Sequence, residues 1–259
     1  MYGEEVRELL RYRDLWWNLV TRELTVKYRR SILGFFWTML HPAVNTAVFT
    51  IVFAAIFKLS IKEFVIYLLV GLQIWNFFAQ STALASRCLL QNAQLIRKVY
   101  LPRSVFVAAI VTSQLINLGL GLLPVLLLIF WLGNGLTGAV LFLPLALAFA
   151  VLFTLGIGLM VAVVSVFFPD LMEAYQLLLM PWMYFTPVVY PLHIVPPQFI
   201  PLLKLNPMYY VVECFRGPLF PGTWPSLPDA ALAALFSVGV FFLGMKVFIK
   251  YQDDLIYYV

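Results

Sequence analysis

The chain has 259 residues, of which 63% are hydrophobic and 11% are charged, and its mean hydropathy is +0.93. A soluble domain carries about 25% charged residues, so this composition excludes an ordinary soluble fold and requires a lipid bilayer as solvent. The net charge of +5 follows a pattern that indicates membrane topology, and we expect no nucleic-acid partner.

Residues 1–30 carry too many charges to cross a membrane. Apolar residues recur at helical spacing, at Leu9, Tyr12, Trp16 and Leu19, and most arginines lie on the other face. A basic amphipathic helix with tryptophans is typical of one that lies in the membrane interface. One interpretation is a simple anchor. The other is a portal for an anionic lipid headgroup, guarded by Trp16, Trp17, Arg22, Lys27, Arg29 and Arg30.

Long apolar segments predict an all-α membrane protein. At about 1.5 Å per residue, a helix of some 20 residues crosses a hydrocarbon layer of about 30 Å. We predict six spanning helices, over residues 35–57, 64–85, 104–132, 140–168, 172–190 and 229–248.

The basic residues predict which side faces the cytoplasm. If the N-terminus is inside, 13 of the 17 Lys and Arg residues fall in inner segments. Cytoplasmic loops carry an excess of Lys and Arg. We therefore expect a multi-pass membrane protein with both termini in the cytoplasm.

Polar, uncharged residues lie inside two predicted spans. Gln73, Asn76 and Gln80 form a stripe along the second span, and Gln114 and Asn117 lie in the third. Such residues often make hydrogen bonds between helices. The alternative is a channel wall for a neutral, hydroxyl-rich substrate.

Aromatic residues are candidates for the same wall, because Tyr and Trp rings offer flat faces to sugar rings. The candidates are Trp75, Phe78, Tyr184 and Tyr190. Packing in the core or at the membrane interface is the alternative interpretation for each of them.

A polar and basic segment interrupts the apolar sequence over 86–103, which we expect to be a cytoplasmic loop. Within it, a short amphipathic helix ends before Pro102, and such a helix can dock into the groove of a partner protein. An ordinary basic loop is the alternative. The candidate contact residues are Asn92, Gln94, Leu95, Ile96, Arg97, Lys98, Val99 and Tyr100.

Nine prolines fall between residues 191 and 228. Proline in a helix interior removes a hydrogen bond and clashes with the preceding turn, so one continuous helix is excluded. The pieces between the prolines are apolar. We therefore predict short re-entrant or interfacial helices before the last span, which form an outer gate region.

The sequence lacks the residues that nucleotide hydrolysis, metal binding or ion-driven transport would require. There is no P-loop for nucleotide phosphates, and His41 and His193 stand alone, so we expect no catalytic site and no metal site. The predicted spans hold almost no charges at mid-depth, which disfavours transport driven by protons or sodium ions. Energy for transport would have to come from another subunit.

Four segments resemble the ABC-2-type permeases that export polysaccharide, and most closely those for lipid-linked O-antigen and teichoic acid chains. The resemblance covers essentially the whole chain. Its strongest marks are RYRDLWWNLVTRELTVKYRRSILGFFWTMLHP (Arg11–Pro42), NAQLIRKVYLPRS (Asn92–Ser104), FFPD (Phe167–Asp170) and LNPMYYVVECFRGPLF (Leu205–Phe220).

The resemblance implies a single membrane domain over 1–259 in the inner membrane of a prokaryote. It also implies that the chain forms a homodimer with two separate ATPase subunits, which bind ATP and Mg²⁺. It implies that residues 92–100 enter a groove on each ATPase and that a lipid-linked polysaccharide crosses a channel between the permeases. One alternative is an ABC-2 permease for a small lipid, a lipo-oligosaccharide or a drug. Another is a membrane scaffold without transport activity.

Overall fold

The computed structural model describes residues 11–28, 61–98, 101–131 and 135–258, together with the single positions 40, 44 and 48. Within these residues every regular element is a helix. The elements in chain order are α2 (Arg13–Tyr28), α4 (Ile61–Gln91), α5 (Ala93–Lys98), α6 (Ser104–Trp131), η1 (Gly138–Phe142), α7 (Leu143–Phe167), α8 (Leu171–Phe185), η2 (Leu192–Ile194), η3 (Pro197–Phe199), α9 (Ile200–Lys204), α10 (Pro207–Leu219), α11 (Leu227–Tyr251) and α12 (Leu255–Tyr258).

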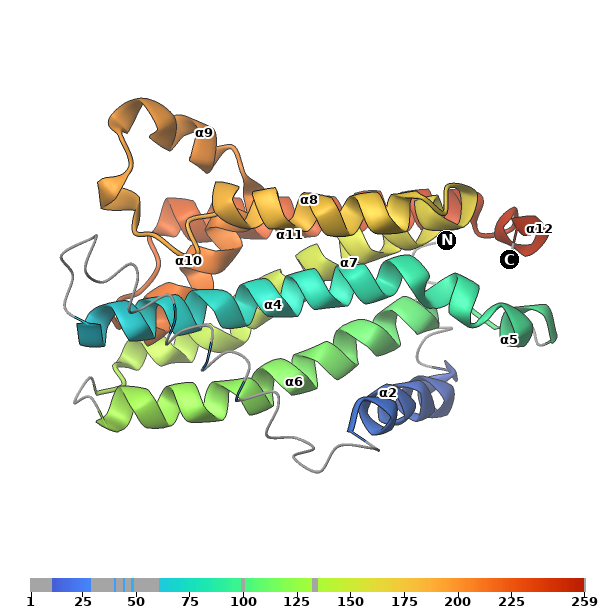
Figure 1. Cartoon of the computed structure of the whole chain (residues 1–259), viewed down its shortest axis with the longest axis horizontal. Helices are drawn as coiled ribbons and strands as arrows, with labels where there is room; N and C mark the ends of the chain where they lie inside the picture. Colours follow the sequence, from blue (N-terminus) through green and yellow to red (C-terminus); the bar gives the residue numbers. More distant parts are fainter. Residues whose placement is uncertain are drawn as a thin grey trace.

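Helices α4, α6, α7, α8 and α11 run lengthwise in one bundle (Figure 1). Four helical segments of the described chain are long and apolar enough to cross a membrane: Phe64–Gln91, Ser104–Trp131, Gly138–Phe167 and Leu227–Tyr251. They coincide with four of the six predicted spans. The span predicted over 35–57 lies outside the described residues, apart from positions 40, 44 and 48.

The span predicted over 172–190 is shorter in the structure. Helix α8 has 15 residues and ends at Phe185, so it is about 22 Å long and falls short of the hydrocarbon layer. Thr186, which follows it, has extended backbone angles and precedes Pro187. A proline disfavours helical geometry in the residue before it, which explains why the helix stops there.

The span predicted over 64–85 is longer in the structure. Helix α4 has 31 residues and continues to Gln91, so residues 86–91 are helical and not part of a loop. The extension is apolar on one side, because Cys88 and Leu89 are buried against other helices. The hydropathy of the extension is lowered by the polar residues on its other side, and this hid the continuation of the helix.

Two α-helices of the described chain begin at side-chain caps. The Ser226 hydroxyl accepts a hydrogen bond from the backbone N–H of Asp229. Helix α11 begins at Leu227, two residues before the start predicted from the sequence. The Asn206 side chain accepts the backbone N–H of Met208 at the start of α10. Both caps satisfy an N–H group that has no partner within its own helix.

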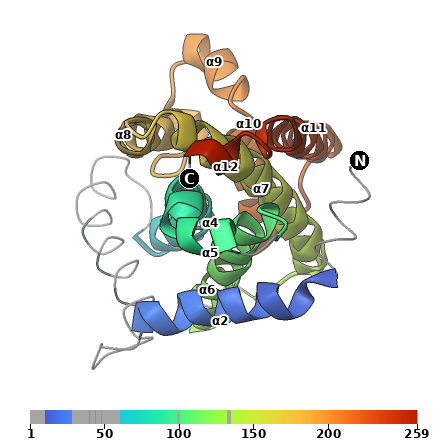
Figure 2. The ribbon, with the colours of Figure 1, turned by 90° about the vertical axis from the view of Figure 1, so that its right-hand side faces the viewer.

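Helix α2 lies across the bundle and not along it (Figure 2). It packs on α6, and Leu19 and Val20 are buried in this contact. Only residues 11–28 of the predicted interfacial segment 1–30 are described.

The two ends of the bundle carry different elements (Figure 1). Helices α2, α5 and α12 lie toward one end, which we call the α5 end. The short helices η2, η3 and α9 lie at the other, which we call the α9 end. The described residues 191–228 are broken into short helices, as the prolines predicted.

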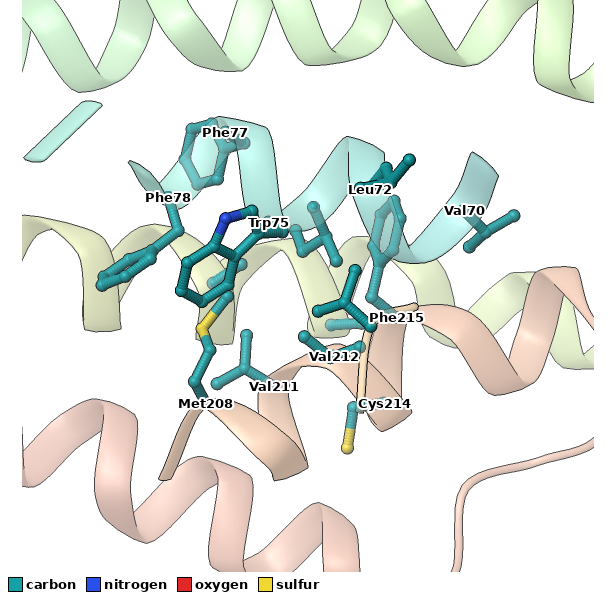
Figure 3. Close-up of a cluster of buried hydrophobic side chains, with 14 of the residues drawn as sticks. Val70, Leu72, Trp75, Phe77, Phe78, Met208, Val211, Val212, Cys214 and Phe215 are labelled. Carbon is teal, nitrogen blue, oxygen red and sulfur yellow. The ribbon is translucent and has the colours of Figure 1, made fainter. Parts of the chain in front are cut away.

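Helix α4 lies in the middle of the bundle and contacts α6, α7, α8 and α10. Its buried residues Trp75 and Phe78 lie near Met208 and Val211 of α10 (Figure 3). A second apolar cluster fills the α5 end and joins α2 to the ends of α4, α7 and α11.

Candidate functional site

A cavity of about 440 Å³ opens between α2, α4, α6 and α8. We call it the amide pocket, because four of its lining side chains are uncharged amides in an otherwise apolar bundle. They are Gln80, Gln114, Asn117 and Gln176. The structure thus brings together one residue of the predicted stripe in α4 and both polar residues predicted in the third span.

The amides of the pocket make hydrogen bonds to one another and to the backbone. The Asn117 amide donates to the side-chain oxygen of Gln114 at 3.1 Å, and Gln176 donates to the Met172 carbonyl at 3.4 Å. Gln80 is exposed. An amide donates and accepts hydrogen bonds at once, so this lining matches sugar hydroxyl groups, which do the same.

Charged side chains at the pocket lie in opposite-charge pairs. Arg87 lines the pocket and lies 3.0 Å from Glu173, and Glu23 lines it and lies 3.1 Å from Arg22. Each pair brings together one positive and one negative charge. The polar lining of the pocket therefore favours a neutral, hydroxyl-bearing ligand over a bare ion.

Three of the predicted channel residues lie in the core of this chain. Gln73 is 6% exposed and donates to the Gly121 carbonyl of α6 at 2.7 Å. Trp75 and Phe78 are buried and make edge contacts with the Trp182 ring. These three side chains therefore pack the bundle and reach none of its surfaces. Asn76 is half-buried.

Tyr184 and Tyr190 lie at a second cavity, toward the α9 end. This cavity, which we call the aromatic cleft, has a volume of about 440 Å³ and is almost entirely apolar. The Tyr190 hydroxyl donates to the Tyr184 carbonyl at 2.6 Å. Burial raises the pKa of Tyr190 further above neutrality, and its hydroxyl, which is protonated at neutral pH, acts as the donor in this bond. The lining residues are Pro181, Tyr184, Phe185, Tyr190, Val195, Phe199, Leu202 and Leu203.

Four of the six predicted portal residues, Trp16, Trp17, Arg22 and Lys27, belong to α2. Trp16 is half-buried, Trp17 is 59% exposed and Arg22 is exposed. Arg22 donates to the side chain of Asn92 at 3.0 Å, which joins α2 to the start of α5. The side chain of Lys27 lies outside the described part of the structure. The other two predicted portal residues, Arg29 and Arg30, lie outside the described residues altogether.

The predicted contact helix is α5, and its described part ends at Lys98, so the predicted Val99 and Tyr100 lie outside the described residues. Gln94, Arg97 and Lys98 are exposed and form a polar, basic face. Ile96 is 8% exposed and packs in the apolar cluster of the α5 end, and Leu95 is half-buried there. The surface that a partner can reach is therefore the polar face.

Sequence reasoning gave no role to Arg216, which lies in the predicted outer gate region of residues 191–228. The structure buries this side chain in α10. Val212, Phe215 and Leu219 recur at helical spacing around it and are all apolar and buried, and this pattern could have indicated a buried helix. Sequence reasoning also missed Gln176, a single amide within the apolar segment of α8.

Comparison with known proteins gives consistent matches along the chain. The family model described as ABC-2 type transporter matches residues 14–220. The O-antigen export system permease protein RfbA of Myxococcus xanthus is 33% identical over 251 residues, 96% of each chain. A protein of the same name from Klebsiella pneumoniae is 26% identical over 92% of each chain. The polysialic acid transport protein KpsM of Escherichia coli is 26% identical over 89% of this chain and 90% of the relative.

Proposed function

The chain belongs to the ABC-2 type transporter family, and from this premise we propose that it exports a lipid-linked, O-antigen-like polysaccharide across a bacterial inner membrane. It is a multi-pass membrane protein and the permease of an ABC-2 exporter. Relatives named as O-antigen export permeases align with nearly its whole length, which supports this substrate class.

The observation that carries the proposal is the amide pocket. Gln80, Gln114, Asn117 and Gln176 converge there from three helices of an apolar bundle. Polar side chains inside a membrane protein are costly and usually face a partner or an aqueous path. Uncharged amides favour a sugar chain over a hydrocarbon, which would need no such donors and acceptors.

The energy would come from a partner. Membership of the ABC-2 family implies an ATPase partner. In the arrangement that we propose, two copies of this chain associate with two ATPases, which bind ATP and Mg²⁺. The exposed face of α5, with Gln94, Arg97 and Lys98, is the proposed contact for each ATPase. This places the α5 end in the cytoplasm, with both termini there and the α9 end outside.

The route of the substrate follows from this orientation. The anionic headgroup of the lipid would pass α2, where Trp17 and Arg22 are exposed and where Glu23 lines the amide pocket. An amphipathic helix across the bundle suits a position in the headgroup layer. The polymer would leave near the short helices of residues 191–228.

Stimulation of the ATPase partner tests the proposal. The permease is purified with its ATPase and placed in lipid nanodiscs, and ATP hydrolysis is measured with a polyprenyl-diphosphate-linked polysaccharide from the native host. We expect hydrolysis to rise with the glycan-bearing lipid and not with the same lipid without its glycan. Equal stimulation by both lipids would favour export of a small lipid, and failure to bind any ATPase would favour a scaffold.

A further inference from the structure

Arg216 is a buried charge near the α9 end of the bundle. The side chain is 1% exposed, and it lies in α10, which packs on α4, α7 and α11. A charged group taken out of water is costly unless it is paired and hydrogen-bonded. Its contacts therefore indicate what the fold gains from keeping an arginine at this position.

The guanidinium of Arg216 joins three parts of the chain. Its Nη2 donates to the Pro187 carbonyl at 2.7 Å and lies 3.4 Å from Oε1 of Glu213. Its central carbon lies 3.9 Å from the centre of the Tyr67 ring of α4, which is cation–π geometry. Its Nε and Nη1 have no acceptor among the described residues.

These contacts converge on residues 186–190, which we call the 186–190 turn. The Tyr67 hydroxyl lies within hydrogen-bond distance of the Pro187 and Tyr190 carbonyls, at 3.0 and 2.9 Å. A Cβ atom at Gly71 would lie 3.1 Å from the Val188 carbonyl oxygen, so the turn rests directly on the backbone of α4. The Asn206 amide holds its start by donating to the Thr186 hydroxyl at 2.8 Å.

The 186–190 turn carries one wall of the aromatic cleft. Tyr190 is its last residue and donates its hydroxyl to the Tyr184 carbonyl, and both tyrosines line the cleft. Carbonyls in a turn have no partner of the kind that a helix provides. Without Arg216 and Tyr67, the Pro187 and Tyr190 carbonyls would lose their donors, and the position of Tyr190 would no longer be fixed.

We infer that Arg216 and Tyr67 are positioning residues for the exported polymer, which they serve by holding the 186–190 turn so that Tyr184 and Tyr190 face sugar rings in the aromatic cleft. This inference rests on the proposed function. Flat tyrosine faces with a polar tip suit sugar rings. A side chain that only filled space at position 216 would be better apolar, because a buried charge stabilises a fold less than apolar packing of the same volume.

Two substitutions at one position separate positioning from packing. Arg216→Met keeps most of the volume and removes the donor, whereas Arg216→Lys keeps a charged donor. The ATPase activity of the nanodisc complex is measured against the concentration of the polyprenyl-diphosphate-linked polysaccharide. For Arg216→Met we expect the half-saturating concentration to rise roughly three- to tenfold, the effect of losing one hydrogen bond. The maximum rate should change little, and Arg216→Lys should lie between Arg216→Met and the wild type.

Tyr67→Phe is the second arm, and it carries the test if Arg216→Met does not fold. It keeps the ring beneath the guanidinium and removes only the hydroxyl, so it should also raise the half-saturating concentration. If the variants fold and show wild-type half-saturation, the inference is overturned. A fall in maximum rate that only follows the loss of folded protein also overturns it, because it indicates a packing role. A wild-type complex that the glycan does not stimulate contradicts the proposed function itself.

Discussion

Gln73 and Gln80 lie on the same helix at positions that share a face, yet the structure gives them different surroundings. Gln73 donates to the Gly121 carbonyl of α6, where a Cβ atom on Gly121 would lie 2.8 Å from the Gln73 amide nitrogen. Gln80 is exposed at the amide pocket, two turns nearer the α5 end. Helix α6 is therefore close to α4 at one residue and farther away at the other.

Cysteine substitution tests this difference. We expect Gln80→Cys to react with a water-soluble thiol reagent at least about tenfold faster than Gln73→Cys, which can react only after local opening of the helix contact. The two native cysteines, Cys88 and Cys214, are buried and should give little background. The two rates are measured from the time course of labelling in permeabilised membrane vesicles. Equal labelling of both positions would show that the whole stripe faces water.

Residue spacing predicted the polar stripe on α4, but it did not predict that one end of the stripe is buried and the other is exposed. The spacing of Gln73, Asn76 and Gln80 gives a shared helix face, and it contains no information on where a neighbouring helix crosses that face. Arg216 is a similar case, because its burial depends on α4 and on the 186–190 turn, which are distant in sequence. Both outcomes are set by tertiary packing.

At the scale of elements, the contact between α7 and α11 depends on two glycines. A Cβ atom at Gly244 would overlap the Gly156 carbonyl, and one at Gly156 would overlap the Val240 carbonyl. The two backbones therefore touch at this point. Gly156 and Gly244 are distant in the sequence, and only the structure places one against the other.

Gly244→Ala should destabilise the protein by about 1–3 kcal/mol, because the helices must separate to admit the methyl group. Gly239→Ala is the matched control on the same helix, since a Cβ atom there has no neighbour within 4 Å. It should be neutral or stabilise by up to about 1 kcal/mol, because alanine favours a helix more than glycine does. Thermal unfolding of the purified proteins in detergent measures both. The close contact is refuted if both variants unfold at the same temperature as the wild type.

Helix α5 has an exposed polar face and a buried apolar side, and substitutions on the two should differ in kind. Lys98→Glu should weaken binding of the ATPase partner and leave thermal unfolding unchanged. Ile96→Asp should lower the stability of the permease, since it places an unpaired charge in the apolar cluster of the α5 end. Co-purification and thermal unfolding separate the two effects. Lys204→Glu, an exposed basic position toward the α9 end, is the control and should change neither. If the Lys98→Glu variant bound the ATPase as well as the wild type does, the exposed face of α5 would not be the contact surface.

At the scale of the whole molecule, hydropathy predicted much of the architecture. Four described spans match their predicted ranges to within a few residues, except where α4 continues to Gln91. A window of apolar residues does not reveal that Pro187 stops α8 five residues early, or that α10 packs inside the bundle. The two ends carry different functions in our proposal: the α5 end binds the ATPase and the α9 end releases the polymer.

Polymer translocation tests the central claim most directly. The permease and its ATPase are reconstituted in proteoliposomes with the ATPase facing outward, and lipid-linked polysaccharide is added outside. Protection of the polymer from an external glycosidase is then measured. We expect protection to require ATP and both subunits together, because this chain conducts the polymer and its partner supplies the energy. Protection by the permease alone, or no protection when ATP and both subunits are present, would contradict the account.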